Sequence, residues 1–375
     1  MSSKILLLSA YDAASHRLWR ERLVALFPEY QWTQLILPPR NFSWRIRGNS
    51  LLWGFGETEI LERDYQLLIA TSMVDLSSLR GFVPALSKLP TLVYFHENQF
   101  VYPPGSQRSE NIEPQLVPLY SALCADAVVF NSHYNRTTFL EGAKSLFQRL
   151  PDQLPRGLLP RLENSQVIPV PLARFDLSAV SKSTRSAPLE IVWNHRWEYD
   201  KGPALLLEIV KIINKYQLPL NLHIVGEQFR QQPPQFDQIR RLLIKHAENL
   251  KLAPSKFGYI TDQESYYQLL ARCDAVLSTA LHDFQGLAIQ EACAAGCTPL
   301  APDNLVYSEY LDAQYLYSMR GKDRAIAGSI VDKLVEWHQQ KVIDQPLPKV
   351  NLDQYQQQHV RSRYADIFSS LLNHN

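Results

Sequence analysis

Cysteine is scarce in this sequence, and no two cysteines form a close pair. The 375 residues contain four, at Cys124, Cys273, Cys293 and Cys297, and none of them is spaced as Cys-x-x-Cys. A zinc knuckle or a dithiol redox motif would need such a pair. We therefore expect four reduced thiols in the core of a cytoplasmic protein.

Long apolar runs and an excess of one charge are also missing. We find no stretch of about 18 apolar residues that would span a bilayer, and "KILLLS" near the start is too short for a signal-peptide core. Lys and Arg number 38 against 37 Asp and Glu, a formal net charge of +1. No global field draws such a protein to nucleic acid or to a membrane, although a local basic patch remains compatible with these numbers.

Short apolar runs alternate with helical patterns along most of the chain. "KILLLS" (4–9) and "TLVYF" (91–95) read as buried strands, and residues 15–27 read as an amphipathic helix with Ser15 as its N-cap. Strand, helix, strand is typical of parallel α/β layers. The alternation of strand and helix patterns is interrupted around 150–187 and resumes with "LEIVWN".

The fold class we predict is α/β, with two halves of similar size and a cleft between them. We expect a first domain at 1–170, a linker at 171–187, a second domain at 188–350 and a C-terminal helix at 351–375 that packs back on the first domain. Open parallel sheets bind ligands at the carboxyl ends of their strands. Polar clusters that follow strands are therefore candidate site residues.

The second half contains two such clusters. Asp283 and Glu291 stand about two helical turns apart, on either side of a turn at Gly286. Two carboxylates can bind hydroxyls at both ends of an elongated ligand, and the helix N-terminus between them can bind an anion. Arg196 and Lys201 follow another strand and suit a diphosphate. Taken alone, each cluster could equally be an ordinary solvated loop.

The first half contains "YFHENQF" (94–100), which presents polar groups of three kinds at a strand exit. His96, Glu97, Asn98 and Gln99 are either site residues or a polar turn that satisfies itself. Near the first strand, "SAYDAASH" places Ser15 and His16 at a helix start, where His16 either faces the cleft or serves as a capping or core residue.

These motifs together resemble a known family. The Arg196-x4-Lys201 segment and the acidic-x7-Glu helix in "FQGLAIQEACAAGCTPLA" resemble the GT-B glycosyltransferases of the family-4 type. "PPRNFSWRIRGNSL", "LVYFHENQFVYP", "AVVFNSHYN" and "LVYSEYL" are similar to the glycosyltransferase-like proteins associated with mannosylation of queuosine in tRNA. The resemblance runs across nearly the whole chain.

The resemblance implies a GT-B fold, in which two Rossmann-like domains face a central cleft, and a retaining transfer without metal or other cofactor. It implies that Arg196 and Lys201 bind the donor diphosphate, that Glu291 holds the ribose and that Asp283 meets sugar hydroxyls. The backbone at Phe284, Gly286 and Leu287 would approach the sugar and phosphates. The sequence departs from the family pattern in having Asp283 in place of glutamate, and Ala13 and Ala14 in place of glycines.

For the acceptor side, we expect His96 to touch the transferred sugar. The remaining acceptor candidates are Ser15, His16, Arg45, Glu97, Asn98 and Gln99. A protein that binds tRNA should carry a local cluster of basic residues. Residues 136–174 carry a net charge of +3, and "PPRNFSWRIRGN" interleaves arginines with Phe42 and Trp44, as suits unstacked bases. The alternative is a solvated loop with its tryptophan anchored in the core.

The function predicted is transfer of a hexose, namely mannose from GDP-mannose, to a cyclopentenediol hydroxyl of queuosine in tRNA. Two alternatives stay open. One is a family-4 enzyme acting on a lipid, polysaccharide or small molecule; the other is a silent nucleotide-sugar or RNA-binding protein on the same fold. The departures at Asp283, Ala13 and Ala14 are the best support for the second alternative.

Overall fold

The computed structural model describes residues 2–101, 112–173 and 187–373, which divide into two compact units. Unit 1 comprises Met1–Pro171 together with Asp353–Asn375, and unit 2 comprises Leu172–Leu352. The linker that we expected at 171–187 lies mostly outside the described residues.

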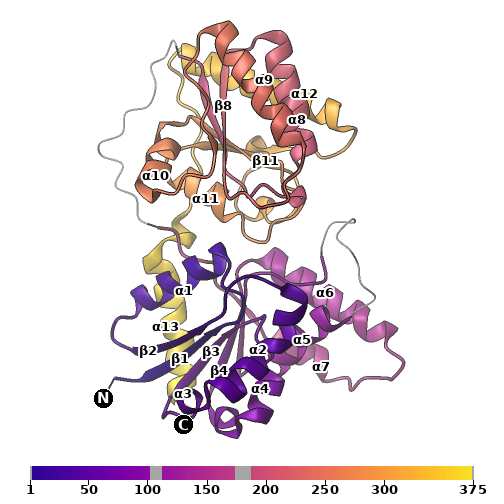
Figure 1. Cartoon of the computed structure of the whole chain (residues 1–375), viewed down its shortest axis with the longest axis vertical. Helices are drawn as coiled ribbons and strands as arrows, with labels where there is room; N and C mark the ends of the chain where they lie inside the picture. Colours follow the sequence, from indigo (N-terminus) through magenta and orange to yellow (C-terminus); the bar gives the residue numbers. More distant parts are fainter. Residues whose placement is uncertain (1, 102–111, 174–186, 374–375) are drawn as a thin grey trace. The chain divides into compact units, whose positions relative to one another are not determined.

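Unit 1 is built on a six-stranded, wholly parallel sheet with the strand order β2-β1-β3-β4-β5-β6 (Figure 1). In chain order its elements are β1 (Lys4–Ser9), α1 (Ala14–Leu26), β2 (Gln31–Ile36), α2 (Phe42–Gly56), α3 (Thr58–Leu61), β3 (Leu67–Thr71), α4 (Leu76–Phe82), η1 (Pro84–Lys88), β4 (Thr91–Phe95), α5 (Glu113–Cys124), β5 (Ala127–Phe130), α6 (His133–Arg149), α7 (Leu158–Glu163), β6 (Gln166–Val167), η5 (Asp353–Tyr355) and α13 (Gln357–Asn373).

The strands of unit 1 form where the sequence has short apolar runs. The predicted strands at 4–9 and 91–95 are confirmed as β1 and β4, and every residue of β4 is buried. The helix predicted at 15–27 is also present, but Ser15 as its N-cap was wrong. The N-cap is Ala13, which makes no side-chain hydrogen bond, and Ser15 already lies exposed in the first turn.

Helix α2 was missed by the sequence analysis, which treated the "PPRNFSWRIRGN" stretch as a loop. Apolar residues in this segment lie all around the helix instead of on one face, so the amphipathic pattern is absent. Trp53 and Ile46 lie in the core of unit 1, whereas Trp44 is 52% exposed. The alternative of a tryptophan anchored in the core is therefore wrong for Trp44.

The C-terminal helix α13 packs against α1 within unit 1 (Figure 1). The indole N–H of Trp19 donates a hydrogen bond of 2.8 Å to the hydroxyl of Tyr364. Arg361 donates to the carbonyl of Leu26, and the ring of Phe368 lies 5.0 Å from that of Phe27. The last helix of the chain thus completes the fold of the first unit.

Unit 2 repeats the architecture with a second parallel sheet of order β12-β11-β10-β7-β8-β9. In chain order its elements are β7 (Leu189–Trp193), η2 (Tyr199–Lys201), α8 (Pro203–Tyr216), β8 (Leu220–Val225), α9 (Gln235–Leu250), β9 (Phe257–Gly258), α10 (Gln263–Arg272), β10 (Ala275–Leu277), α11 (Leu287–Ala294), β11 (Thr298–Pro302), η3 (Tyr307–Glu309), η4 (Ala313–Tyr315), β12 (Leu316–Tyr317) and α12 (Asp323–Val342).

Each sheet reverses its strand order at one point. In unit 1 the chain runs from β1 to β2 on one side and then places β3 on the other side of β1. In unit 2 the same reversal falls between β7 and β10. Ligands of open α/β sheets bind at the carboxyl ends of the strands beside such a switch point. The loops after β7 and β10, residues 194–198 and 278–286, are therefore the expected site in unit 2.

Two expectations from composition can be compared with the structure. All four cysteines are free thiols, and Cys273 and Cys297 are buried. Within residues 2–101, 112–173 and 187–373, none of the helices combines the length and apolarity that crossing a membrane requires.

Candidate active site

Lys201 lies at the switch point of unit 2. It ends the short helix η2 and is only 7% exposed. Its ammonium donates to the carbonyl of His282 at 2.6 Å and lies 3.3 Å from a carboxylate oxygen of Asp200. A second carboxylate oxygen, on Asp283, is 3.8 Å away. The buried cation is thereby fixed between the two loops that the sequence analysis singled out.

Those two loops touch through their backbones. Gly202, which follows Lys201, has a positive φ of 66°, and a Cβ built there would lie 1.9 Å from the carbonyl oxygen of Thr279. The hydroxyl of Thr279 donates to the carbonyl of Lys201 at 2.7 Å. Glycine is required at this position because any side chain would separate the loops.

Asp283 is held by three groups. One carboxylate oxygen accepts from the backbone N–H of Gly286 at 3.0 Å, and the other accepts from the hydroxyl of Tyr307 at 3.1 Å. Burial raises the pKa of Asp283, but Lys201, His195 and these hydrogen bonds lower it further, so that the net pKa lies below its usual value. The side chain is therefore a carboxylate at neutral pH.

A chain of hydroxyls continues behind Asp283. Tyr307 Oη lies 2.8 Å from Ser278 Oγ, which lies 3.0 Å from Nε2 of His195. Burial, followed by the charge of Lys201, lowers the pKa of His195 to about 4. A neutral imidazole thus ends a buried hydrogen-bonded chain that begins at the carboxylate of Asp283.

Arg196 is more exposed than Lys201, with 47% of its side chain accessible. Its guanidinium forms ion pairs with Glu198 at 2.8 Å and with Asp200 at 3.7 Å. An anionic ligand would have to exchange with these carboxylates, whereas the exposed guanidinium can reorient at low cost. Burial raises the pKa of Glu198, which makes this carboxylate the easier partner to neutralise.

Helix α11 supplies the rest of the donor-site candidates. It begins after Gly286, whose positive φ of 72° favours glycine. The first backbone N–H groups of α11 have no acceptor within the helix, so this end of the helix carries a partial positive charge. Phe284 is buried, and Leu287 opens the helix.

Glu291 is 7% exposed on α11. Its charge contributes, after burial, to raising the pKa of Tyr266 well above its usual range, so the two side chains are electrostatically close. Asn194, at the end of β7, donates to the hydroxyl of Tyr266 and to the carbonyl of Ala288. These bonds fix α11 against the carboxyl end of β7.

His96 in unit 1 is buried, with 5% exposure, and its ring stacks on that of His16 with centroids 4.0 Å apart. Neither of its nitrogens has a hydrogen-bond partner within the described part of the chain. Burial and then the nearby His16 lower the pKa of His96 well below its usual value. A neutral imidazole can donate through one nitrogen and accept through the other.

Asn98 is 1% exposed and its carboxamide is fully engaged inside unit 1. Its amide N–H groups donate to Asn135 and Thr138, and its carbonyl accepts from the backbone of Phe100. Asn135 in turn donates to Asn131, which donates to the carbonyl of His96. This network favours a role for Asn98 in shaping the His96 loop over direct contact with an acceptor.

The other acceptor candidates differ in accessibility. Glu97 accepts from the carboxamide of Gln99 at 3.2 Å, and both side chains are partly exposed. Ser15 is exposed at the start of α1. Arg45 is only 6% exposed, and its Nε has no hydrogen-bond partner among residues 2–101, 112–173 and 187–373.

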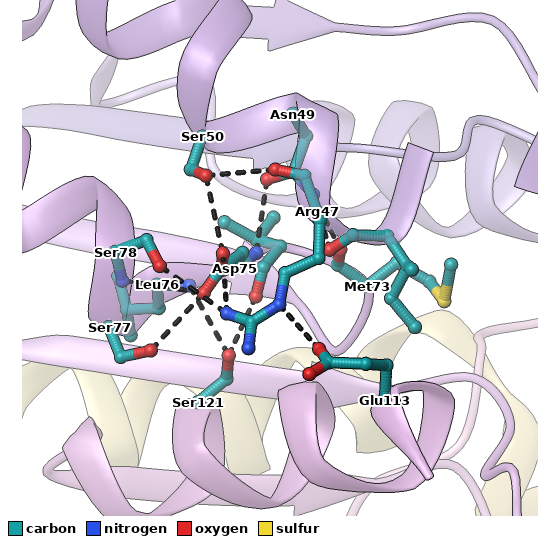
Figure 2. Close-up of polar contacts among 12 residues, drawn as sticks. Arg47, Asn49, Ser50, Met73, Asp75, Leu76, Ser77, Ser78, Glu113 and Ser121 are labelled. Atoms are coloured by element: carbon teal, nitrogen blue, oxygen red, sulfur yellow. Dashed lines mark hydrogen bonds and ion pairs between the residues drawn. The ribbon is translucent and has the colours of Figure 1, made fainter. Parts of the chain in front are cut away.

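Arg47, which the sequence analysis grouped with Arg45, is committed to a structural network (Figure 2). Its guanidinium lies 3.1 Å from the carboxylate of Asp75 and 2.5 Å from that of Glu113. Asp75 is 1% exposed and also accepts from the hydroxyl of Ser50. The network joins α2, the start of α4 and the start of α5, so Arg47 is not a free contact for RNA.

Comparison with known proteins places this geometry in a family. Residues 4–172 match the family model described as tRNA-queuosine alpha-mannosyltransferase N-terminal, and residues 180–333 match that of glycosyl transferases group 1. A Drosophila melanogaster protein named tRNA-queuosine alpha-mannosyltransferase is 30% identical over 349 residues, which is 89% of this chain and 88% of that protein. The chain belongs to the tRNA-queuosine alpha-mannosyltransferase family. It is therefore a glycosyltransferase.

Solved structures support the fold assignment. The Anabaena Alr3699/HepE structure in complex with UDP superposes with a TM-score of 0.61 at 15% identity, covering 99% of this chain and 100% of that one. An E. coli structure described as trehalose-6-phosphate bound with UDP-2-fluoro glucose gives a TM-score of 0.64 at 12% identity, with 99% of each chain covered. The predicted GT-B fold is thus confirmed, while identities this low carry no information on substrate.

In this mannosyltransferase family member, sequence reasoning missed the groups that position the candidates. Tyr307 holds Asp283 and Asn135 holds Asn98 through a hydrogen bond, and Ser278 in turn holds Tyr307. "LVYSEYL" and "AVVFNSHYN" were recognised as family motifs, and these motifs contain Tyr307 and Asn135. Only their contacts could assign the roles.

Within residues 2–101, 112–173 and 187–373, no group of three or more His, Cys, Asp or Glu side chains is arranged to hold a metal ion. The roles of the predicted site residues remain predictions, and so does the expectation that no cofactor is needed.

Proposed function

We propose that this glycosyltransferase moves mannose from GDP-mannose onto a cyclopentenediol hydroxyl of queuosine in tRNA, with retention of the anomeric configuration. The observation that carries the proposal is its 30% identity, over 89% of the chain, to a protein named tRNA-queuosine alpha-mannosyltransferase. The N-terminal family model, which covers all six strands of the unit 1 sheet, supports the same acceptor.

The donor side of the proposal rests on unit 2. Arg196 and Lys201 would meet the diphosphate together with the first N–H groups of α11, and Glu291 would accept from ribose hydroxyls. Asp283, already ionised, would accept from hydroxyls of the mannose. No metal or other cofactor takes part in this proposal, because the fixed cations and the helix N-terminus supply the positive potential for the departing diphosphate.

The transfer step is balanced without a protein nucleophile. The acceptor oxygen forms a bond to the anomeric carbon on the face from which the diphosphate leaves. The bond from that carbon to the diphosphate oxygen breaks, and the proton of the acceptor hydroxyl passes to the departing phosphate. The products are mannosylated queuosine and protonated GDP.

The acceptor side of the proposal rests on unit 1. His96, neutral and with no internal hydrogen-bond partner in the described chain, could donate through a ring N–H to a hydroxyl of the sugar. Glu97 and Gln99 are partly exposed at the same loop and could bind the cyclopentenediol.

A transfer assay tests the proposal. Purified protein is incubated with labelled GDP-mannose and either queuosine-containing tRNA or the same tRNA with unmodified guanosine. We expect label only in the queuosine-containing tRNA, and loss of nearly all rate in Arg196→Ala. Label in lipid or glycan, or transfer from UDP-sugars but not from GDP-mannose, would contradict it.

A further inference from the structure

Helix α2 exposes a stripe of large apolar side chains. Trp44 is 52% exposed, Leu51 and Leu52 are each 44% exposed, and Phe55 is 72% exposed. Helices that are apolar all round are normally covered on every face. The exposed face of α2 is therefore a candidate binding surface, and its two ends differ in character.

Trp44, at the N-terminal end of the stripe, is held flat by a glycine. A Cβ built on Gly48, one turn later, would lie 2.3 Å from an indole carbon of Trp44 and within 2.8 Å of two more. The indole therefore lies directly across the helix surface at Gly48. One broad aromatic face rests on the backbone, and the opposite face is available to solvent.

The position of Trp44 links it to the proposed acceptor loop. It lies in the first turn of α2, which starts after the carboxyl end of β2. One turn further on, Arg47 binds Glu113 of α5 (Figure 2). Gln115 of the same turn of α5 donates to the carbonyl of Gln99. Trp44 thus lies at the sheet edge to which the 96–99 loop belongs, whereas Phe55 lies about 16 Å further along the helix.

The surroundings of Trp44 are positively charged. Residues 37–56 contain three arginines and no acidic residue. Arg47 is neutralised by Asp75 and Glu113, but Arg40 is exposed and Arg45 has a buried Nε without a partner among the described residues. The first turn of α2 has no acidic residue to offset its helix dipole. An aromatic face in such a setting fits a ligand that combines flat rings with phosphates.

We propose that the exposed face of Trp44 is a stacking platform for an unpaired base of the acceptor RNA. This inference rests on the proposed function and adds to it a site for a base other than the one that is glycosylated. Stacking on an aromatic ring recognises unpaired bases without regard to sequence, and the exposed Arg40 can bind an adjoining phosphate.

Two substitutions remove the platform in different ways. Trp44→Ala deletes the ring. Gly48→Ala keeps every side chain of the site but forces the indole off the helix, and it should leave α2 intact because alanine favours helix more than glycine does. We expect both to raise KM for tRNA by about 5- to 150-fold, with kcat and the KM for the sugar nucleotide unchanged. Trp44→Phe should stay within about threefold of the wild type.

Phe55→Ala is the matched control, because Phe55 is an exposed aromatic residue on the same stripe but far from the sheet edge. We expect no change in the KM for tRNA. A direct binding titration uses an RNA hairpin with an unpaired loop and the same sequence as a full duplex. Trp44→Ala should weaken binding of the hairpin and leave binding of the duplex unaltered.

The outcomes separate this inference from the proposed function. If the wild-type protein glycosylates no tRNA, the proposed function fails, and the hairpin titration still tests the platform. If Trp44→Ala and Gly48→Ala leave RNA binding unchanged, the platform is overturned. Equal losses in Phe55→Ala, or a change of molecular mass in solution on Trp44→Ala, would also overturn it and would assign the stripe to a protein interface.

Discussion

Asp283 departs from the family pattern, in which a glutamate, one methylene longer, usually stands at this position. Its oxygens accept from Gly286 and Tyr307, and Lys201 lies within 3.8 Å. A short carboxylate held by three groups has little freedom to move toward a ligand. The contacts of Asp283 with the sugar-nucleotide donor therefore depend on where Tyr307 and Gly286 place its carboxylate.

Tyr307→Phe should weaken use of the donor. Loss of a hydrogen bond to a carboxylate costs roughly 1.5–3 kcal/mol, so we expect kcat/KM for the sugar nucleotide to fall by about 10- to 150-fold. Steady-state kinetics at a fixed tRNA concentration measure this fall in kcat/KM. The matched control is Tyr317→Phe, which removes another buried hydroxyl that donates to the carbonyl of Ser278 without touching Asp283. Equal kinetic losses in both variants would refute a positioning role for Tyr307.

His195 should make the stability of unit 2 depend on pH. Its pKa is lowered from 6.5 to about 4, mainly by burial. Between these two pH values the imidazole is protonated in the unfolded chain and neutral in the folded chain. The contribution of His195 to the free energy of unfolding is fully present above pH 6.5. It falls by about 3 kcal/mol as the pH drops from 6.5 toward 4.

Urea unfolding of the wild type and of His195→Gln across this pH range checks the prediction. The variant should lose less stability between pH 6.5 and 4, although His282, with a pKa also lowered to about 4, keeps part of the slope. His359→Gln alters an exposed histidine and should keep the full slope. An unchanged slope in His195→Gln would show that His195 is protonated in the folded protein.

At the scale of elements, α2, α4 and α5 are joined by one network of polar side chains (Figure 2). Asp75 caps α4 by accepting from the N–H of Ser78 and pairs with Arg47 of α2. Asn49 of α2 accepts from the N–H of Asp75 and donates to the carbonyl of Met73. Buried networks of this kind are costly to break because each orphaned group loses its solvation.

Arg47→Ala should therefore destabilise unit 1 by about 1–3 kcal/mol, since it leaves the buried carboxylate of Asp75 without its cation. Thermal unfolding measures the loss. Arg40→Ala, an exposed arginine of the same segment, should change stability by less than about 0.5 kcal/mol. If both variants were equally stable, the network would contribute nothing, and Arg47 would be free to act in RNA binding.

The elements also show what the sequence could and could not predict. Strands such as β1 and β4 were predictable because a short apolar run bounded by polar or turn residues is typical of a strand buried on both faces of a parallel sheet. Helix α2 was not, because its apolar residues lie all around the helix instead of on one face, and Gly48 lies in its middle. The donor loops were predictable as strand exits, whereas Tyr307 reaches Asp283 from 24 positions away, a contact that no local pattern encodes.

At the scale of the whole molecule, the chain returns to unit 1 after completing unit 2. Tyr364, Ile367 and Phe368 of α13 are buried, and the hydroxyl of Tyr364 satisfies the indole of Trp19. Trp19 stacks on Tyr94, which packs against His96. The C-terminal helix therefore supports the candidate acceptor loop through Trp19 and Tyr94.

A chain truncated after Leu352 should lose the thermal transition of unit 1 and keep that of unit 2. Removing α13 exposes the apolar face of α1 and leaves the buried indole N–H of Trp19 unsatisfied. Differential scanning calorimetry distinguishes the two transitions. Tyr364→Phe, a milder change, should lower the stability of unit 1 by about 1–2 kcal/mol. An unaltered unit 1 transition in the truncated chain would show that α13 is dispensable.

The activity that we propose for this family member is transfer of mannose to queuosine in tRNA. The most direct measurement is mass spectrometry of nucleosides from queuosine-containing tRNA after incubation with the protein and GDP-mannose. We expect a queuosine nucleoside heavier by one hexose, absent with Arg196→Ala and absent when the tRNA carries guanosine. Unmodified queuosine after incubation with the wild-type protein, together with hexose transfer to any other acceptor, would contradict it.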